Sequence, residues 1–435
     1  MVSPGERAGR VTAPGGRTAG AVAERRPARL TLRVRRVPGP GIVSVRGWLP
    51  GGARVEGVPG QALVAGRALS EGTRRRDWRQ IADDSEALGM SVGSSASFEA
   101  HGVAVDARAA HWGEALDWVA ELLGEPSFPE DRCRWVARQA AAELESLADQ
   151  PEVRTAWAFL EQLYAPHPRS RPLQGSAESL AGLGAPDCAL FHGEALRRGG
   201  LTLAVTGDLD EEAVRRYLEG LAVPRGADPE PRGEAPEVPE PRGLPERRRE
   251  VPLPPGDQAH LYAGCLTVPK AHPDRHALEV LGVVLGAGAG LTGRLPERVR
   301  EREGLAYSVQ VQPLGGAGLD PGRLVVYVGT SPDTVGQAEA AVAEELRRVV
   351  EEGVKAEEVE RARAYLLGRD PFRRETARQW AELLGEAVLY GVPEDDPEWV
   401  RAELEAVDAE AVTAAARRHV DVEGLKVTVG VPRTA

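Results

Sequence analysis

The sequence predicts a mixed α/β protein (α+β in its layout) that is built from two similar halves. The same order of elements occurs before residue 223 and again after residue 257. In each half, strands are followed by helices, then by paired strands and then by further helices. A repeat of this length indicates a duplicated unit. Residues 223–257 are dominated by Pro, Glu, Arg and Gly, so they carry too few apolar side chains to form a core. We therefore predict an N-terminal half at 29–222, a linker at 223–257 and a C-terminal half at 258–435.

The elements of the first half are predicted from apolar periodicity and turn residues. Strands are expected where apolar residues alternate or run together between turn residues, at 30–37, 41–49, 90–98, 103–108 and 201–207. Helices are expected where apolar residues recur at helical spacing, at 59–69, 78–88, 112–123, 131–148, 152–164 and 211–221. A turn at Ala100–Gly102 is expected to join the third strand to the fourth.

The second half repeats this order. Strands are expected at 259–268, 306–313, 324–329 and 425–431. Helices are expected at 274–285, 356–367, 376–390 and 408–419, together with a charged helix that ends at Gly304. One further helix is expected to be capped by Ser331, because Pro332 fits its first turn and apolar residues follow at helical spacing.

Composition excludes several classes of protein. The 435-residue chain has a net charge of −12, which argues against a nucleic-acid partner, since phosphate binding usually requires a basic surface. No stretch has the length and apolar character of a membrane span. Cys133, Cys188 and Cys265 are widely spaced and form no C-x-x-C pair, which favours a reducing, cytoplasmic location. Residues 1–28 lack the apolar core of a secretory signal and are expected to be a disordered tail.

Residues 293–310 combine a charged helix with the start of a strand. Glycine commonly ends helices, so the helix is expected to end at Gly304. Arg300 then lies in its last turn and Tyr307 at the start of the strand, and both can point past the corner. A cation and a phenol so placed can bind one carbonyl or oxyanion. The structural alternative is a solvated helix charge beside a half-buried strand aromatic.

This stretch resembles the second-half motif of the pitrilysin/insulinase family of zinc metallopeptidases, Ser-Arg-Leu-x-x-x-x-Arg-x-x-x-Gly-Leu-Ala-Tyr-Ser. The residues that match are Arg294, Leu295, Arg300, Gly304, Leu305, Ala306, Tyr307 and Ser308. The resemblance implies two similar α/β halves, each a mostly antiparallel sheet with helices on one face. It also implies that Arg300 and Tyr307 bind the substrate backbone opposite a zinc ion.

Zinc-binding members of this family carry H-x-x-E-H on the helix that corresponds to the first predicted helix. The two histidines ligate zinc and the glutamate is the general base. Alignment of Ala68–Thr73 with the family's downstream segment places Leu63, Gly66 and Arg67 at these positions. Leucine and glycine have no ligand atom, and arginine stays protonated. Glu143 takes the position of the remaining zinc ligand, and without the histidines we interpret it as a relic.

A second pair of histidines, His272 and His276, has the spacing of a helical metal site. Pro273 is expected to begin the helix, however, which leaves His272 outside it, and the glutamate of a zinc motif is missing. We therefore predict no metal site at this pair.

The glycine-rich turn near residue 288 has two interpretations. Gly288–Gly293 satisfies G-x-G-x-x-G but follows a helix instead of a strand, so no nucleotide site is predicted. In the non-catalytic subunit of the mitochondrial processing peptidase a glycine-rich loop takes part in substrate handling, and the resemblance makes Gly286, Gly288 and Gly290 a candidate peptide-contact loop. The structural alternative is a flexible turn between helices.

We interpret the chain as the non-catalytic, substrate-binding subunit of a heterodimeric zinc metallopeptidase. In bacterial heterodimers of the family one chain supplies zinc and H-x-x-E-H, while the other supplies the Arg/Tyr pair. The resemblance thus implies a homologous partner chain that holds the zinc, an unfolded peptide as substrate, and no cofactor or peptidase activity for this chain alone. The alternative is an inert structural protein or a homodimeric peptide-binding relative, because loss of the zinc ligands fits it equally well.

Overall fold

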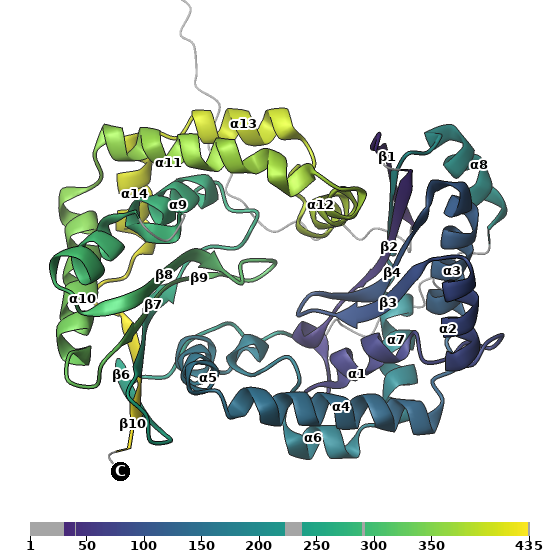
Figure 1. The fold of residues 1–435 in the computed structure, drawn as a ribbon, viewed down its shortest axis with the longest axis horizontal. Helices are drawn as coiled ribbons and strands as arrows, with labels where there is room; N and C mark the ends of the chain where they lie inside the picture. Colours follow the sequence, from purple (N-terminus) through teal and green to yellow (C-terminus); the bar gives the residue numbers. More distant parts are fainter. Residues whose placement is uncertain (1–29, 40, 222–236, 289–291, 434–435) are drawn as a thin grey trace, which may run out of the picture.

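The computed structural model describes residues 30–39, 41–221, 237–288 and 292–433. It contains two five-stranded sheets, each with the main helices of its own half packed on one face (Figure 1). The expected tail at 1–28 and the linker residues 223–236 lie outside the described residues. Within the described part of the chain, none of the helices combines the length and apolar character that a bilayer crossing requires.

The first sheet has the strand order β1-β5-β2-β4-β3. Its strands are β1 (Thr31–Arg36), β2 (Ile42–Pro50), β3 (Ser91–Ala96), β4 (Ala100–Arg108) and β5 (Thr202–Gly207). β1 pairs with β5 in parallel, and the other neighbours are antiparallel. Every residue of β5 is buried, as expected for an inner strand with neighbours on both edges.

The turn predicted at Ala100–Gly102 is wrong. Ala100 already begins β4, and the chain reverses at Ser97–Glu99. The Ser97 hydroxyl accepts hydrogen bonds from the backbone N–H groups of Glu99 and Ala100, at 3.2 and 3.1 Å. A serine hydroxyl that caps its own turn therefore decides the position of the hairpin, not the nearby glycine.

The second sheet has the order β6-β10-β7-β9-β8, which repeats the topology of the first. Its strands are β6 (Arg248–Leu253), β7 (Ala259–Leu266), β8 (Ala306–Gly315), β9 (Arg323–Thr330) and β10 (Lys426–Pro432). β6 pairs with β10 in parallel, as β1 does with β5, and the remaining pairs are antiparallel. Two equivalent, mostly antiparallel sheets confirm the predicted fold class.

The predicted linker is too long at its C-terminal end, because β6 lies inside it. β6 is the counterpart of β1 and forms one edge of the second sheet. Only Val251 and Leu253 are buried in it, while Arg248 and Glu250 are exposed and Pro252 donates no hydrogen bond. Charged residues and proline are tolerated on edge strands, which is why this strand resembles linker sequence.

The helices of the first half agree with the predicted apolar stripes. They are α1 (Gln61–Ala68), α2 (Trp78–Ala87), α3 (Trp112–Gly124), α4 (Glu130–Ala148), α5 (Pro151–Tyr164), α6 (Ala177–Gly182), α7 (Ala185–Arg198) and α8 (Glu211–Gly220). Asp77 begins α2 with a reciprocal capping box to Gln80. α6 and α7 were not predicted, and α7 has only a short buried stripe of Cys188, Phe191, His192 and Ala195.

The helices of the second half are α9 (Arg275–Gly282), α10 (Val335–Glu352), α11 (Ala356–Arg369), α12 (Ala377–Tyr390), α13 (Pro397–Glu405) and α14 (Ala409–His419). Two segments, η4 (Val283–Ala287) and η5 (Pro296–Arg302), are π-helical. The cap predicted at Ser331 is wrong, since α10 begins at Val335 after a turn in which the Thr334 N–H donates to the Ser331 carbonyl.

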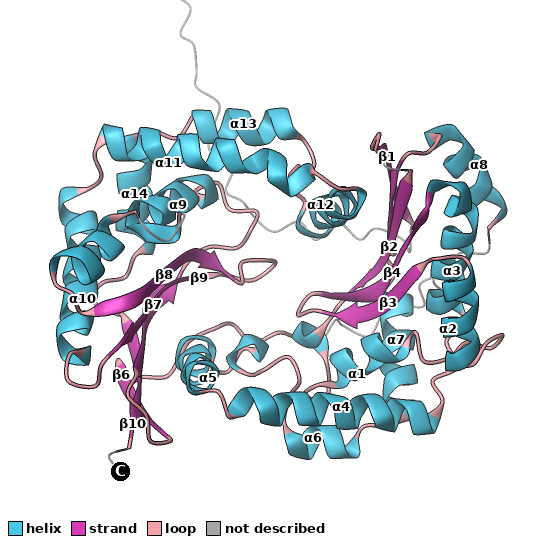
Figure 2. Cartoon of the chain, viewed as in Figure 1, coloured by secondary structure: helices cyan, strands magenta, loops and turns pink. Residues whose placement is uncertain are grey.

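Each half contributes one helix to the other half's sheet. α5 packs on β7 and β10 of the second sheet, and α12 packs on β2 and β5 of the first (Figure 2). These contacts form two small shared clusters, separate from the main core of each half: Phe159, Leu163, Tyr164, Tyr262, Val325 and Tyr327 in one, and Ala204, Ala381 and Leu384 with Trp48 in the other. The two halves are therefore joined by apolar packing as well as by the chain.

Candidate functional site

The positions that correspond to the zinc motif lie on α1 and are closed by packing. Leu63 is 3% exposed and belongs to the core of the first half. A Cβ atom at Gly66 would lie 2.8 Å from both the Ala96 Cβ and the Ser95 carbonyl oxygen. β3 thus packs directly on α1, and a glutamate at position 66 would not fit unless the strand moved.

The third motif position, Arg67, forms an ion pair with Glu143 of α4. The Arg67 Nη1 donates to the Glu143 Oε2 at 2.8 Å, and the Gln174 Nε2 donates to the other carboxylate oxygen at 3.3 Å. The hydrogen bond from Arg67 lowers the pKa of Glu143. The guanidinium therefore supplies the positive charge that this carboxylate pairs with, and these residues do not fit a zinc ion.

The corner between η5 and β8 is held by backbone hydrogen bonds. Gly304 has a φ of +61°, and the Leu305 N–H donates to the Val299 carbonyl at 2.8 Å. The Thr330 hydroxyl donates to the Leu305 carbonyl at 2.6 Å. The sequence prediction that a helical segment ends at Gly304 and turns directly into a strand is confirmed.

Arg300 and Tyr307 lie on opposite sides of this corner. The Arg300 Nε lies 3.5 Å from the Glu301 Oε1, and the Arg300 side chain is partly exposed. The backbone of Tyr307 is at a break in register, because Ala306 pairs with Thr330 while Ser308 pairs with Gly329. Such bulges commonly re-aim a side chain next to a functional site. The Tyr307 side chain lies outside the described residues, so the expected role of the pair stays a prediction.

The glycines of the interhelical turn are needed for close packing. Gly286 has a φ of +139°, and a Cβ there would lie 2.7 Å from the Pro296 Cδ. A Cβ at Gly293 would lie 2.6 Å from the Gly286 Cα. Gly286 is buried, which argues against the peptide contact that the resemblance implied for it. Gly290 lies outside the described residues, and Gly288 borders a cavity.

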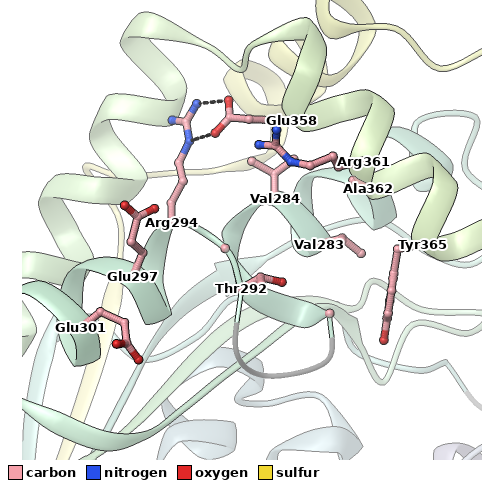
Figure 3. Close-up of a pocket in the computed structure, with 12 residues that line it drawn as sticks. Val283, Val284, Thr292, Arg294, Glu297, Glu301, Glu358, Arg361, Ala362 and Tyr365 are labelled. Atoms are coloured by element: carbon pink, nitrogen blue, oxygen red, sulfur yellow. Dashed lines mark hydrogen bonds and ion pairs between the residues drawn. The ribbon is translucent and has the colours of Figure 1, made fainter.

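This cavity, of about 490 Å³, lies between η4, η5 and α11 (Figure 3). Its lining combines charged residues with apolar and aromatic ones: Arg294, Glu297, Glu301, Glu358, Arg361, Val283, Val284, Ala362 and Tyr365. Arg294 forms two hydrogen bonds with Glu358, at 2.8 and 2.7 Å, and one with the Gly353 carbonyl. Arg294, a residue of the sequence motif, therefore fastens the beginning of η5 to α11.

A smaller cavity of about 180 Å³ lies between α5 and the second sheet. Phe159, Tyr262 and Tyr327 form an aromatic wall, with centroid distances of 5.8 Å between the first two and 5.0 Å between the tyrosines. Gln310 and Gln312 line it from β8, the strand that follows the η5–β8 corner.

His272 and His276 do not form a site together. The His276 Nδ1 pairs with the Glu279 Oε2 at 2.9 Å. His272 lies outside α9, as predicted, but the helix begins at Arg275 and not at Pro273. The structure instead brings His272 close to Asp274 and His419. Sequence analysis missed this group because His419 is 145 residues from Asp274 in the chain.

Comparison with known proteins finds relatives over most of the chain. Residues 186–366 match the family described as "Peptidase M16 inactive domain". The predicted resemblance to the pitrilysin/insulinase (M16) family is confirmed. The chain is 29% identical over 413 residues to an uncharacterized zinc protease of Mycobacterium bovis, covering 92% of this chain and 91% of that protein. It is 23% identical over 370 residues to the non-peptidase homolog YmxG of Helicobacter pylori, covering 84% and 83%.

Solved structures share the fold. The chain superimposes on a peptidase M16 inactive domain from Pseudomonas fluorescens with a TM-score of 0.81 at 22% identity, covering 93% of this chain and 96% of that one. A protease from Helicobacter pylori gives a TM-score of 0.80 at 17% identity, covering 94% and 99%. The chain is thus similar to M16 inactive-domain proteins in sequence and in fold, and Leu63, Gly66 and Arg67 offer no zinc ligand at the motif positions.

Proposed function

We propose that this chain is the non-catalytic, substrate-binding subunit of a heterodimeric zinc peptidase. The observation that carries the proposal is the contrast between two sites of one chain. On α1 the metal position is closed by the ion pair of Arg67 with Glu143 and by the packing of β3 on Gly66. At the η5–β8 corner the residues of the family motif remain, on a hydrogen-bonded turn.

In this proposal Arg300 and Tyr307 act on a peptide that is held in the active site of a partner chain. The partner supplies H-x-x-E-H, and with it the zinc ion and the general base. Arg300 provides a fixed positive charge and Tyr307 a phenol donor, and both would bind the substrate carbonyl and the negative charge that develops on its oxygen. Donors that are positioned before the reaction stabilise the transition state more than the ground state.

The test is peptide cleavage by this chain reconstituted with a homologous H-x-x-E-H chain from the same genome. Arg300→Ala and Tyr307→Phe are each expected to lower turnover by about 10²- to 10³-fold, the effect that loss of one oxyanion donor typically has. Tyr307→Phe removes one hydroxyl and keeps the ring. Complex formation is checked by size-exclusion chromatography.

Arg302→Ala is the matched control for the arginine. Arg302 lies two residues from Arg300 on η5, but its side chain is 69% exposed and pairs with Glu297 on the same segment. It is expected to leave turnover within twofold of the wild type, as exposed ion pairs contribute little. Unchanged cleavage in both Arg300→Ala and Tyr307→Phe would overturn the proposal and favour an inert scaffold of the same fold.

A further inference from the structure

Three side chains with metal-ligating atoms meet where α9 begins and α14 ends, two helices that lie side by side (Figure 1). One ligand atom from each of His272, Asp274 and His419 lies within 4.8 Å of the other two. The His419 Nε2 is 2.7 Å from the Asp274 Oδ2, and the His272 Nδ1 is 4.0 Å from the same oxygen. Ligand atoms around a tetrahedral metal are separated by roughly 3.3 Å, so small side-chain movements would complete such a set.

The two imidazole rings are arranged around the carboxylate. Their centroids are 5.1 Å apart at an interplanar angle of 85°, so they approach from different directions, as ligands of one ion must. All three residues are half-buried, which leaves access for an ion from solvent. Within the described residues this is the one group of three such side chains close enough to hold a metal.

We propose that His272, Asp274 and His419 bind one divalent transition-metal ion such as Zn²⁺. Two imidazoles and one carboxylate suit zinc, nickel, copper or ferrous iron, whereas Mg²⁺ and Ca²⁺ prefer oxygen ligands. This site lies in the second half and shares no residue with the degenerate H-x-x-E-H positions. The metal proposal does not depend on the proposed function.

Arg418 competes with the metal at this site. Its Nε and Nη2 donate to the two Asp274 oxygens at 3.0 and 2.9 Å, so the guanidinium neutralises the carboxylate when no ion is bound. The Arg418 side chain is 54% exposed and can move into solvent. The Asp274 N–H also donates to the His272 Nδ1 at 3.0 Å, a hydrogen bond that coordination through this nitrogen would replace. Because a bound ion must replace these hydrogen bonds, the dissociation constant for Zn²⁺ is expected to be micromolar and not nanomolar.

The experiment is titration calorimetry of the full chain, freed of metal by chelator and of any affinity tag, with Zn²⁺ and separately with Mg²⁺. Zn²⁺ is expected to bind at a ratio of one to one, and Mg²⁺ to give no saturable heat. Asp274→Asn and His419→Gln are each expected to weaken Zn²⁺ binding at least about tenfold. His111→Gln is the matched control: His111 pairs with Glu114 in the other half and should not affect binding.

Arg418→Gln gives a test with the opposite sign. Removal of the competing cation is expected to tighten Zn²⁺ binding several-fold, which a merely structural role for the cluster would not produce. Cobalt(II) adds a spectroscopic readout, since visible absorption bands would report coordination by protein ligands. Circular dichroism verifies that each variant is folded. Absence of saturable Zn²⁺ binding, binding that is unchanged in the Asp274 and His419 variants, or weaker binding by Arg418→Gln would overturn the proposal.

Discussion

Arg67 and Glu143 form an ion pair of 2.8 Å at the two positions where zinc-binding members of the family place a histidine and a glutamate ligand. Both residues are partly exposed, at 34% and 41% for their side chains. The pair joins α1 to α4. Arg67 provides the counterion of the Glu143 carboxylate at this place.

Arg67→Ala should therefore change the chemistry of Glu143 more than the stability of the fold. The pKa of Glu143 is expected to rise toward its ordinary value, because the hydrogen bond from Arg67 lowers it. The free energy of unfolding is expected to fall by less than about 1 kcal/mol, since exposed ion pairs are screened by water. Carboxylate titration by NMR and urea unfolding measure the two effects. A loss of several kcal/mol would show that the pair is a main support of the α1–α4 contact.

Restoring the zinc motif should not restore a peptidase. Gly66→Glu, alone or with Leu63→His and Arg67→His, is expected to lower stability by about 1–3 kcal/mol, because β3 fills the space a side chain would need. Gly66→Ala should show part of this loss. Gly368→Ala is the control, since a Cβ at Gly368 of α11 would meet no atom within 4 Å, and alanine there is expected to be neutral or stabilising. Chelator-sensitive proteolysis by the triple variant alone would contradict this account.

Asp320 links the two halves. It accepts hydrogen bonds from the Arg54 Nε and Nη2 at 2.7 and 2.9 Å, and the His167 Nε2 lies 3.2 Å away. Burial alone would raise the pKa of Asp320, but His167 and Arg54 hold it well below its usual range. Asp320→Asn removes the charge and keeps the shape. It is expected to cost about 1–3 kcal/mol at pH 7, since the partly exposed Arg54 and the buried His167 lose the carboxylate that they contact. Urea unfolding measures the loss, and wild-type stability in the variant would show that this contact does not hold the halves together.

Glu394 predicts a pH dependence within the second half. Burial raises its pKa, but Arg275 and Arg373 overcome this effect and bring it to about 2. Because the folded-state value lies below the ordinary value of 4.5, the stabilisation is complete above pH 4.5 and is lost as the pH falls toward 2. Wild-type unfolding free energy should therefore decline across this range. Glu394→Gln should be less stable at neutral pH and should decline less steeply. An identical slope in both proteins would show that Glu394 titrates normally.

The packing of α12 on the first sheet is tested at Gly385. A Cβ there would lie 1.9 Å from the Trp48 ring, so Gly385→Ala must displace the ring or the helix. We expect a loss of about 1–3 kcal/mol and a shift in tryptophan fluorescence. Gly336→Ala is the matched control, because Gly336 lies in α10 with open space around it. Equal stability and fluorescence in the two variants would mean that the contact between α12 and the sheet adapts freely.

Helices and strands with a clear apolar periodicity could be predicted from the sequence. An element that forms only by pairing with a strand far away in the chain could not. The stripe of α3, with Leu116, Val119 and Leu123 buried, has the helical spacing that predicts it. β6 has no such signal. Arg248 of β6 pairs with Val427 of β10, which lies 179 residues further along the chain. The side chains of β6 remain mostly exposed. Pairing with a distant strand is a tertiary event, so local composition indicated a linker instead.

The sequence by itself determined the repeat, the motif at Arg300 and Tyr307 and the loss of the zinc ligands, because each depends on which residue stands at which position. Only the tertiary structure decided what these residues contact. It placed Arg67 against Glu143, closed the space at Gly66 with β3, and gathered Asp274 and His419 from two helices. Interactions of this kind depend on the distance and direction of side chains from separate elements, and these are set by the packing of the sheets and helices and not by local periodicity.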